Sequence, residues 1–243
     1  MKNRRKLTVF LILLFLVTAP VVYAEVLQID SDFDGKLDQW HHLDENGKTI
    51  KIEFDNNGDG KLDQIDIYKS HAHPIEASID RNLDGKLDQF QFYSEDGKLL
   101  RVEKDTDYTG TIDRIEFFAT DKHIERIESD ENRDGAIDLI QHFDAQEILV
   151  RIEYDKDFNG NIDRWEYYGD REKLLSAAFD SNNDKKPDQW QYFLDSTVLS
   201  RVEFDTNFDS KVDRLEFYNA NRELDRVELD RNHDGKLDLV QRK

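Results

Sequence analysis

The chain is built from a repeat of 25 residues, and this period constrains its fold more than any other feature. Nine aspartates recur at this spacing without insertion: Asp30, Asp55, Asp80, Asp105, Asp130, Asp155, Asp180, Asp205 and Asp230. Each opens a nine-residue acidic segment close to D-x-[DN]-x-D-G-x-[LI]-D. We predict one repeat array over residues 25–243, with a truncated ninth repeat. The repeats are 30–54, 55–79, 80–104, 105–129, 130–154, 155–179, 180–204, 205–229 and 230–243.

Two short β-strands are predicted in each repeat beside its acidic segment. In the third repeat, residues 87–93 and 99–104 alternate between apolar and polar side chains, and Asp96-Gly97 lies between them. A period of two indicates a strand, and an Asp-Gly pair predicts a tight turn. Because no part of residues 25–243 keeps helical spacing, we predict an all-β fold of tandem 25-residue β-hairpin repeats.

The placement of charge favours an antiparallel meander over a parallel β-solenoid. A solenoid would stack Glu103 near Glu128, with like charges about 4.8 Å apart. Antiparallel pairing would set Arg151 opposite Glu166 across an acidic loop, and opposite charges on neighbouring strands are stabilising. The same register predicts the pairs Glu153–Arg164, Arg101–Glu116, Glu103–Arg114, Arg201–Glu216, Glu203–Arg214 and Lys51–Asp66. We therefore predict a meander with the acidic loops along one edge.

This register also predicts one apolar face and one polar face. The apolar face would carry Trp40, Ile52, Ile65, Ala77, Phe90, Val102, Ile115, Ile127, Ile140, Ile152, Trp165, Ala177, Trp190, Val202, Leu215 and Val227. Curling of the sheet, folding over as a sandwich and dimerisation would each cover such a face, and the sequence leaves this choice open.

Two further architectures stay as alternatives. Repeats four, six and eight share an Arg-x-Glu sequence, which adds a period of 50 residues and suggests four-stranded β-propeller blades. The propeller ranks second, because its blades need a longer crossing connection than these uniform turns provide. An outer-membrane barrel ranks third, because strands of six or seven residues are shorter than the 9–11 that a span requires.

The acidic segments predict calcium sites. Calcium takes six to eight oxygen ligands at about 2.3–2.6 Å, supplied mainly by carboxylates and carbonyls on tight loops. In the first segment, Asp30, Asp32 and Asp34 converge if the chain curls, Gly35 permits the sharp turn, and Asp38 closes the shell. Magnesium fits less well, because it prefers a stricter octahedron and retains its waters.

The predicted ligands are the first, third, fifth and ninth residues of each loop. They are Asp30, Asp32, Asp34, Asp38, Asp55, Asn57, Asp59, Asp63, Asp80, Asn82, Asp84, Asp88, Asp105, Asp107, Thr109, Asp113, Asp130, Asn132, Asp134, Asp138, Asp155, Asp157, Asn159, Asp163, Asp180, Asn182, Asp184, Asp188, Asp205, Asn207, Asp209, Asp213, Asp230, Asn232, Asp234 and Asp238. Up to nine ions are expected. Binding should be weaker in loops four, seven and eight, where Thr109 replaces a carboxylate and Lys185 and Ser210 replace glycine.

These D-x-D-x-D-G-x-x-D loops resemble the calcium hairpin loops of integrin α-chain repeats of the FG-GAP type. They also resemble the first half of EF-hand and dockerin loops. An EF-hand would have helices on both sides of the loop and a bidentate glutamate at loop position 12. In this chain the residues at that position belong to the polar face of a predicted strand; they are His41, Asp66, Gln91, Glu116, Gln141, Glu166, Gln191, Glu216 and Gln241. The resemblance therefore implies the β-hairpin version, with the ninth residue as last ligand.

The N-terminus is typical of an export signal over residues 1–24. Lys2 to Lys6 are basic, Leu7 to Val17 are apolar, and Ala24 ends a small-residue cleavage pattern. From residue 25 onward the chain has 30 basic and 54 acidic residues, a net charge of −24. Such acidity works against binding to nucleic acids and anionic membranes. The absence of cysteine excludes disulfides.

The sequence predicts a non-enzymatic, exported calcium-binding protein with a structural or adhesive role, in the periplasm, at the cell surface or outside the cell. No integral membrane segment is expected after signal cleavage. The alternative is a calcium-dependent module that binds a cell-surface protein or glycan. Its candidate contacts are Tyr68, Tyr93, Phe118, Tyr168 and Tyr218, although packing within each hairpin explains them more simply.

Overall fold

The structure, a computed structural model, describes residues 25–69, 72–119 and 123–242. The predicted export signal, residues 1–24, lies outside the described residues. The strands are β1 (Glu25–Ile29), β2 (Gln39–Leu43), β3 (Thr49–Phe54), β4 (Gln64–Ile67), β5 (Glu76–Ile79), β6 (Gln89–Tyr93), β7 (Leu99–Lys104), β8 (Arg114–Phe118), β9 (Ile124–Ser129), β10 (Leu139–Phe143), β11 (Leu149–Tyr154), β12 (Arg164–Gly169), β13 (Lys173–Phe179), β14 (Gln189–Phe193), β15 (Leu199–Phe204), β16 (Arg214–Tyr218), β17 (Leu224–Leu229) and β18 (Leu239–Arg242). A short 3-10 helix, η1 (Asp170–Glu172), lies between β12 and β13.

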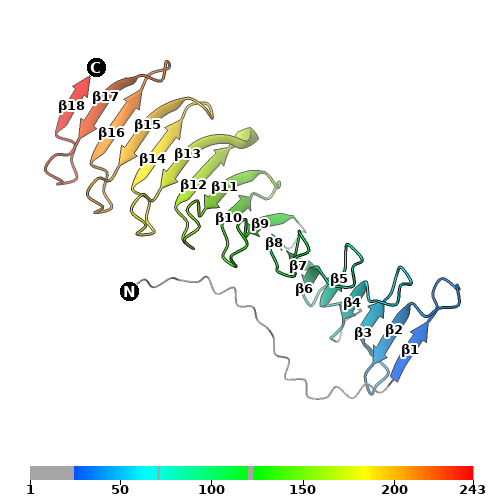
Figure 1. The fold of residues 1–243 in the computed structure, drawn as a ribbon. Helices are drawn as coiled ribbons and strands as arrows, with labels where there is room; N and C mark the ends of the chain where they lie inside the picture. Colours follow the sequence, from blue (N-terminus) through cyan, green and yellow to red (C-terminus); the bar gives the residue numbers. More distant parts are fainter. Residues whose placement is uncertain (1–24, 70–71, 120–122, 243) are drawn as a thin grey trace. The chain divides into compact units, whose positions relative to one another are not determined.

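The strands form the predicted antiparallel meander. From β1 to β8 and from β10 to β18, each strand pairs antiparallel with the next strand in the chain, and all eighteen belong to one sheet (Figure 1). Antiparallel pairing excludes the parallel solenoid, and the continuous sheet excludes separate propeller blades. Because each acidic loop leads from an odd-numbered to an even-numbered strand, within each of the two units into which the chain divides the acidic loops share one edge of the sheet and the other connections share the opposite edge. These other connections are not uniform, contrary to the prediction: η1 joins β12 to β13, and the connection from β4 to β5 is longer than the five-residue turns.

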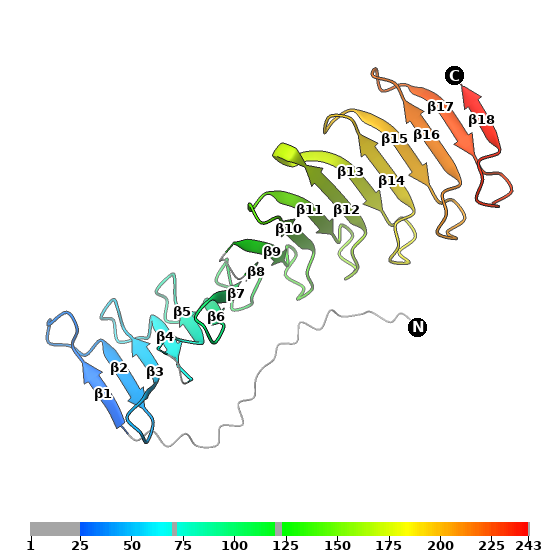
Figure 2. The same cartoon turned by 180° about the vertical axis from the view of Figure 1, so that it is seen from behind.

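The chain forms two units, which divide after Ile127. The first contains β1–β8 and most of β9, and the second contains the end of β9 and β10–β18. Within each unit the strands lie side by side in a single layer, and no described helix or strand is stacked on either face (Figure 2). The described residues include no helix that is long and apolar enough to cross a membrane.

The register differs from the prediction by one residue, so the predicted cross-strand ion pairs are wrong. Ile152, and not Arg151, lies opposite Glu166. Closure of the acidic loop explains this offset, because the N–H of Asp163 donates to the carbonyl of Tyr154 at 2.8 Å. The same bond closes all nine loops. The offset also removes Glu153–Arg164, Arg101–Glu116, Glu103–Arg114, Arg201–Glu216, Glu203–Arg214 and Lys51–Asp66.

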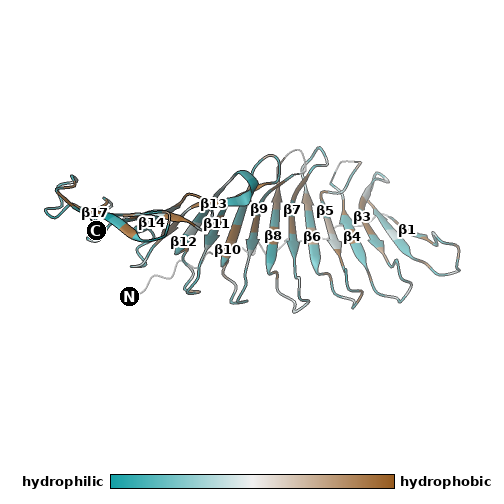
Figure 3. Ribbon diagram, turned by 90° about the horizontal axis from the view of Figure 1, so that it is seen from above, coloured by the Kyte–Doolittle hydropathy of each residue, from teal (hydrophilic) through white to brown (hydrophobic). Residues whose placement is uncertain are grey.

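A one-residue offset moves side chains of alternate strands to the other face, so the predicted all-apolar face is also wrong. Apolar and polar residues mostly alternate from strand to strand along each row, and Figure 3 shows hydrophilic and hydrophobic residues mixed along the sheet. On one face, row one consists of Ile52, Asp66, Ala77, Gln91, Val102 and Glu116 in the first unit, and of Gln141, Ile152, Glu166, Ala177, Gln191, Val202, Glu216, Val227 and Gln241 in the second. On the opposite face, row two consists of Trp40, Glu53, Ile65, Ser78, Phe90, Glu103 and Ile115, and of Ile140, Glu153, Trp165, Ala178, Trp190, Glu203, Leu215, Glu228 and Val240.

The alternating rows explain how a single layer buries apolar side chains. Val202 lies between Gln191 and Glu216, whose hydrocarbon stems flank it on the neighbouring strands. It is only 3 % exposed, although nothing is stacked above it. Ala177, between Glu166 and Gln191, is likewise buried. Row one therefore presents no continuous apolar surface, whereas on row two Trp165, Ala178 and Trp190 lie side by side on three successive strands.

The buried glutamates of row one are paired along their own strands. Arg164 forms an ion pair with Glu166, and the hydroxyl of Tyr154 also donates to Glu166 at 3.3 Å. A buried carboxylate without such donors would be strongly destabilising. Equivalent pairs recur on both faces, at Arg114–Glu116, Arg214–Glu216, Arg101–Glu103, Arg151–Glu153, Arg201–Glu203 and Arg226–Glu228.

Arginines also cover aromatic rings on the facing strand. The guanidinium of Arg201 lies 4.2 Å from the ring centroid of Tyr192, and that of Arg226 lies 3.9 Å from the centroid of Phe217. Each such contact contributes about 0.5–1 kcal/mol at an exposed site. The long side chains thus perform the shielding that a second layer provides in other β proteins.

Because the hydrocarbon stems of neighbouring polar residues shield them, the buried side chains of row one should contribute to the free energy of unfolding. Val202→Ala should lower the free energy of unfolding by about 1–3 kcal/mol, because it leaves a cavity between two strands. Val240→Ala is the matched control, since Val240 is 55 % exposed at β18. Urea unfolding curves would measure both variants, and equal losses would contradict this account of the core.

Glu116 gives the sheet a pH dependence. Burial raises the pKa of Glu116, but Lys104 and Arg114 outweigh burial and hold the pKa below its ordinary value. The Nζ of Lys104 and the Nε of Arg114 each lie 2.8 Å from Oε1 of Glu116. A carboxyl group with a lowered pKa stabilises the fold above its unfolded-state pKa. That stabilisation is lost as the pH falls through the folded-state pKa.

Glu116→Gln should therefore melt at a lower temperature than the parent at neutral pH, with a difference that disappears in acid. Glutamine fits this position, because Gln91 and Gln191 occupy row one in other repeats. The substitution thus tests charge and not shape. Thermal melts between pH 7 and about pH 3 would measure the effect, and a difference that is constant with pH would argue against it.

Candidate metal centres

Each acidic loop is organised around its first and last aspartates. In loop six, between β11 and β12, Asp155 accepts hydrogen bonds from the N–H groups of Asn159 at 3.1 Å and Gly160 at 2.6 Å. Asp163 accepts a bond from the N–H of Lys156 at 2.8 Å. These bonds curl the chain so that its carboxylates gather on the inside of the loop.

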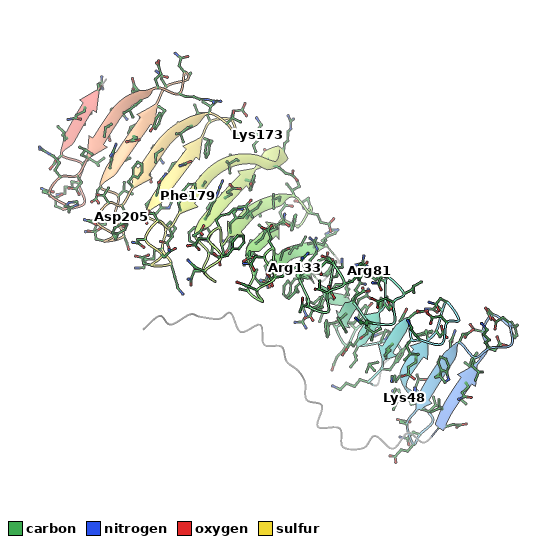
Figure 4. The ribbon with its side chains drawn as sticks, viewed as in Figure 1. Lys48, Arg81, Arg133, Lys173, Phe179 and Asp205 are labelled. Atoms are coloured by element: carbon green, nitrogen blue, oxygen red, sulfur yellow. The ribbon has the colours of Figure 1, made fainter. Side chains whose placement is uncertain are left out.

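The same frame recurs in the other loops. In loops two to nine, the first aspartate is buried; these residues are Asp55, Asp80, Asp105, Asp130, Asp155, Asp180, Asp205 and Asp230. Each accepts a bond from the N–H of the sixth loop residue, at 2.6–2.9 Å. Figure 4 labels Asp205 on this edge of the second unit and Lys173 on the edge that carries the hairpin turns.

The sixth loop residue needs a left-handed backbone, which favours glycine. Gly35 has φ of 92°, and Lys185 and Ser210 adopt 75° and 70° at the same position. Their N–H groups still donate to the first aspartates of loops seven and eight, at 2.6 and 2.7 Å. Replacing glycine therefore leaves the turn in place, at a cost in backbone strain.

Three loops bring three carboxylates together. One oxygen from each residue lies within 4.8 Å of the others in the triads Asp30, Asp32 and Asp38; Asp105, Asp107 and Asp113; and Asp155, Asp157 and Asp163. Oxygens at this separation can share one calcium ion, given its ligand distances of about 2.3–2.6 Å. Loop four belongs to this group despite Thr109, which the sequence alone would rank lower. The other six loops offer an amide oxygen at the third position, from Asn57, Asn82, Asn132, Asn182, Asn207 and Asn232.

The last aspartate of three loops has one oxygen without a hydrogen-bond donor among the described residues. These oxygens are the buried Oδ1 atoms of Asp38, Asp88 and Asp138. The other oxygen of Asp138 accepts bonds from the N–H groups of Glu131 at 2.8 Å and Asn132 at 3.0 Å. A buried carboxylate oxygen without a partner costs free energy, and a cation inside the loop would satisfy it.

In two loops, burial and neighbouring carboxylates disfavour the charged form of an aspartate. Burial raises the pKa of Asp138 although backbone N–H groups oppose this shift, and the nearby carboxylates of Asp130 and Asp134 raise it further. Burial also raises the pKa of Asp155, and Asp157 contributes to the shift. A bound divalent cation would reverse these effects, because it favours the charged form.

Loop eight differs because a histidine reaches its last aspartate. Nδ1 of His233, in loop nine, lies 2.8 Å from Oδ1 of Asp213 and 2.8 Å from the side-chain amide of Asn207. Burial raises the pKa of Asp213, but the hydrogen bond with His233 helps to bring it below its ordinary value. The same bond raises the pKa of His233. His233 would thus compete with a cation for this oxygen, which is consistent with the prediction of weaker binding in loop eight.

Sequence reasoning missed the residues that act between loops. The Nζ of Lys61 in loop two donates to the carbonyl of Asp84 in loop three at 2.8 Å, and Lys36 reaches Gly58 at 3.4 Å. The only signal for such contacts is that a basic residue stands seventh in several loops. These contacts couple adjacent loops within the first unit.

The tyrosines at the turn end are bonded within the sheet. The hydroxyls of Tyr93, Tyr168 and Tyr218 donate to Gln91, Glu166 and Glu216, two residues earlier on the same strand. This arrangement agrees with packing within each hairpin as the reason for these side chains. These hydrogen bonds do not indicate a separate ligand-binding site at the predicted tyrosines.

No family model matches this chain, and no curated protein matches it. Two similar solved structures are described as "Crystal Structure of TcdB2-TccC3 without hypervariable C-terminal region" and "Crystal Structure of TcdB2-TccC3". Each is 10 % identical over 86 % of this chain, with TM-scores of 0.20 and 0.18. The chain spans 17 % of the length of each of those chains. At these TM-scores the likeness carries no argument about function.

Proposed function

We propose that this protein is an exported, non-enzymatic calcium-binding β-repeat protein with a structural or adhesive role, and that calcium stabilises its fold. The buried and unpartnered Oδ1 atoms of Asp38, Asp88 and Asp138 carry this proposal. Each of these oxygens could donate an electron pair to a bound cation, and the surrounding carboxylate and amide oxygens suit a hard cation. Calcium fits better than magnesium, because a curled loop offers an irregular oxygen shell.

Net charge supports the same proposal. The four ligand positions of the nine loops hold 28 aspartates, counted as four in loop one and three in each of the other eight. Nine calcium ions would change the net charge of residues 25–243 from −24 to −6. Without metal, the clustered carboxylates repel one another and oppose the compact loop. Calcium would thus replace the disulfides that often stabilise exported proteins.

A structural or adhesive role follows from the repeat and from the lack of a catalytic arrangement in the sequence. Repeat arrays present extended surfaces on which contacts recur at regular intervals. The calcium levels outside the cell would suit sites of the weak affinities found in extracellular modules. The periplasm, the cell surface and the external medium all satisfy this proposal.

Calcium should raise the thermal midpoint, because an ion that binds only the folded state stabilises it by mass action. Each site contributes about 2.7 kcal/mol when free calcium is 100 times its Kd. Melts of the full chain would be compared in about 5 mM calcium, in about 5 mM magnesium and in EDTA. A rise in calcium alone is expected, and identical midpoints in calcium and EDTA would overturn the proposal.

A single loop substitution should remove a single ion. Asp138→Ala deletes an unpartnered oxygen and is expected to lower the bound calcium by one ion per chain in equilibrium dialysis. Asp144→Ala is the matched control, because Asp144 accepts N–H bonds from Gln146 and Ile148 at 2.9 Å in a hairpin turn outside the loops. An unchanged calcium count for Asp138→Ala, or the same loss in both variants, would count against loop binding.

A further inference from the structure

The tips of the acidic loops carry exposed apolar side chains. The fourth loop residue has a left-handed backbone in all nine loops, with φ between 55° and 70°. In five loops this residue is large and apolar, and we call these five the tip residues: Phe33, Leu83 and Tyr108 in the first unit, and Phe158 and Phe208 in the second. Phe33 is 89 % exposed, and the other four are 38–49 % exposed.

The loop itself does not require these residue types. Gly58 and Asn183 occupy the same position with φ of 70° and 61°. A left-handed backbone favours glycine and asparagine and is strained for a bulky residue such as Phe33. Exposure adds a second cost, because the apolar surface faces water. Phe33, at 89 % exposed, has both costs with almost no burial inside the fold, and the other tip residues leave a large part of their apolar surface in water, which points to a contact outside the fold.

The shared chemistry of the tip residues favours a lipid surface over a sugar or a protein. Leu83 has no ring, so stacking on a sugar face does not account for the set. Adjacent loops are two strands apart, about 10 Å, and polar residues such as Arg133 and Asn183 separate some of the tips. A protein partner would need pockets at matching intervals, whereas the fluid interface of a bilayer accepts apolar side chains at any spacing.

We propose that the calcium-loaded acidic edge of each unit docks on a phospholipid surface, where that unit's tip residues enter the interface and lipid phosphate oxygens complete the coordination of bound calcium. This proposal rests on the proposed calcium binding. Calcium takes six to eight oxygens, and the four ligand positions of a loop leave room for others. Without metal, loop carboxylates would repel lipid phosphates, so the docking depends on calcium.

Co-sedimentation with vesicles tests this docking. The full chain would be mixed with sucrose-loaded vesicles of phosphatidylcholine and phosphatidylglycerol, in calcium or in EDTA. The parent should sediment only with calcium. The triple variant Phe33→Asn, Phe158→Asn and Phe208→Asn should partition at least about tenfold more weakly, because each phenylalanine buried in the interface contributes about that factor. Asparagine suits the left-handed backbone, so the loops should keep their fold.

Leu194→Asn provides the matched control. Leu194 is 74 % exposed and lies after β14 in a hairpin turn, where its N–H donates to the carbonyl of Val198 at 2.9 Å. The substitution removes one highly exposed apolar side chain at the edge opposite to the acidic loops, and it should leave vesicle binding unchanged. Calcium-dependent melting of the parent and both variants would be measured in parallel.

The outcomes separate the docking from calcium binding. If calcium raises the melting midpoint but the parent stays in the supernatant, the docking proposal fails and the proposed function stands. Sedimentation in EDTA, full binding by the triple variant, or an equal loss in Leu194→Asn would each overturn the docking. If calcium leaves the midpoint unchanged, the proposed function itself fails.

Discussion

The hydrogen bond that closes each acidic loop determines the rest of the sheet. The N–H of the last loop residue bonds to the carbonyl before the first aspartate, as between Asp163 and Tyr154. This bond sets which residues face one another on the strands before and after the loop, such as β11 and β12. Because side chains alternate with a period of two, the same bond decides which residues share a face. Loop geometry, and not attraction between strand side chains, thus controls where Glu166 and Ile152 lie.

The register that results allows a single layer to exist without a cover. An all-apolar face would need a second layer, whereas alternation places the aliphatic side chains of row one between polar residues, most of which have long stems. Val202 is buried in this way, between Gln191 and Glu216. The carboxylates that become buried keep partners from their own strand, as Arg214 does for Glu216. Stability therefore rests on contacts between adjacent strands, as expected for a repeat array.

The sequence predicted the strands, the antiparallel meander and the oxygen-bearing loop positions, because each follows from spacing along the chain. It did not predict the register, because a shift of one residue depends on how many residues the curled loop consumes. The apolar-face prediction inherited this error and placed Trp165 with Ile152, which lie on opposite faces. Contacts between loops, such as that of His233 with Asp213, could not be predicted from the sequence, because they join residues that are 20 positions apart.

The same loop that sets the register also gathers the candidate metal ligands, so metal binding and sheet pairing are linked. The N–H of Asp163 closes the loop, while its carboxylate is part of a triad with Asp155 and Asp157. A cation held by these oxygens would oppose opening of the loop and thus fraying of β11 from β12. In a metal-free chain, repulsion among the three carboxylates of the triad would instead favour opening of the loop and weaken the hydrogen bond that closes it. Calcium would therefore act on strand pairing through the loop, although no strand residue binds it.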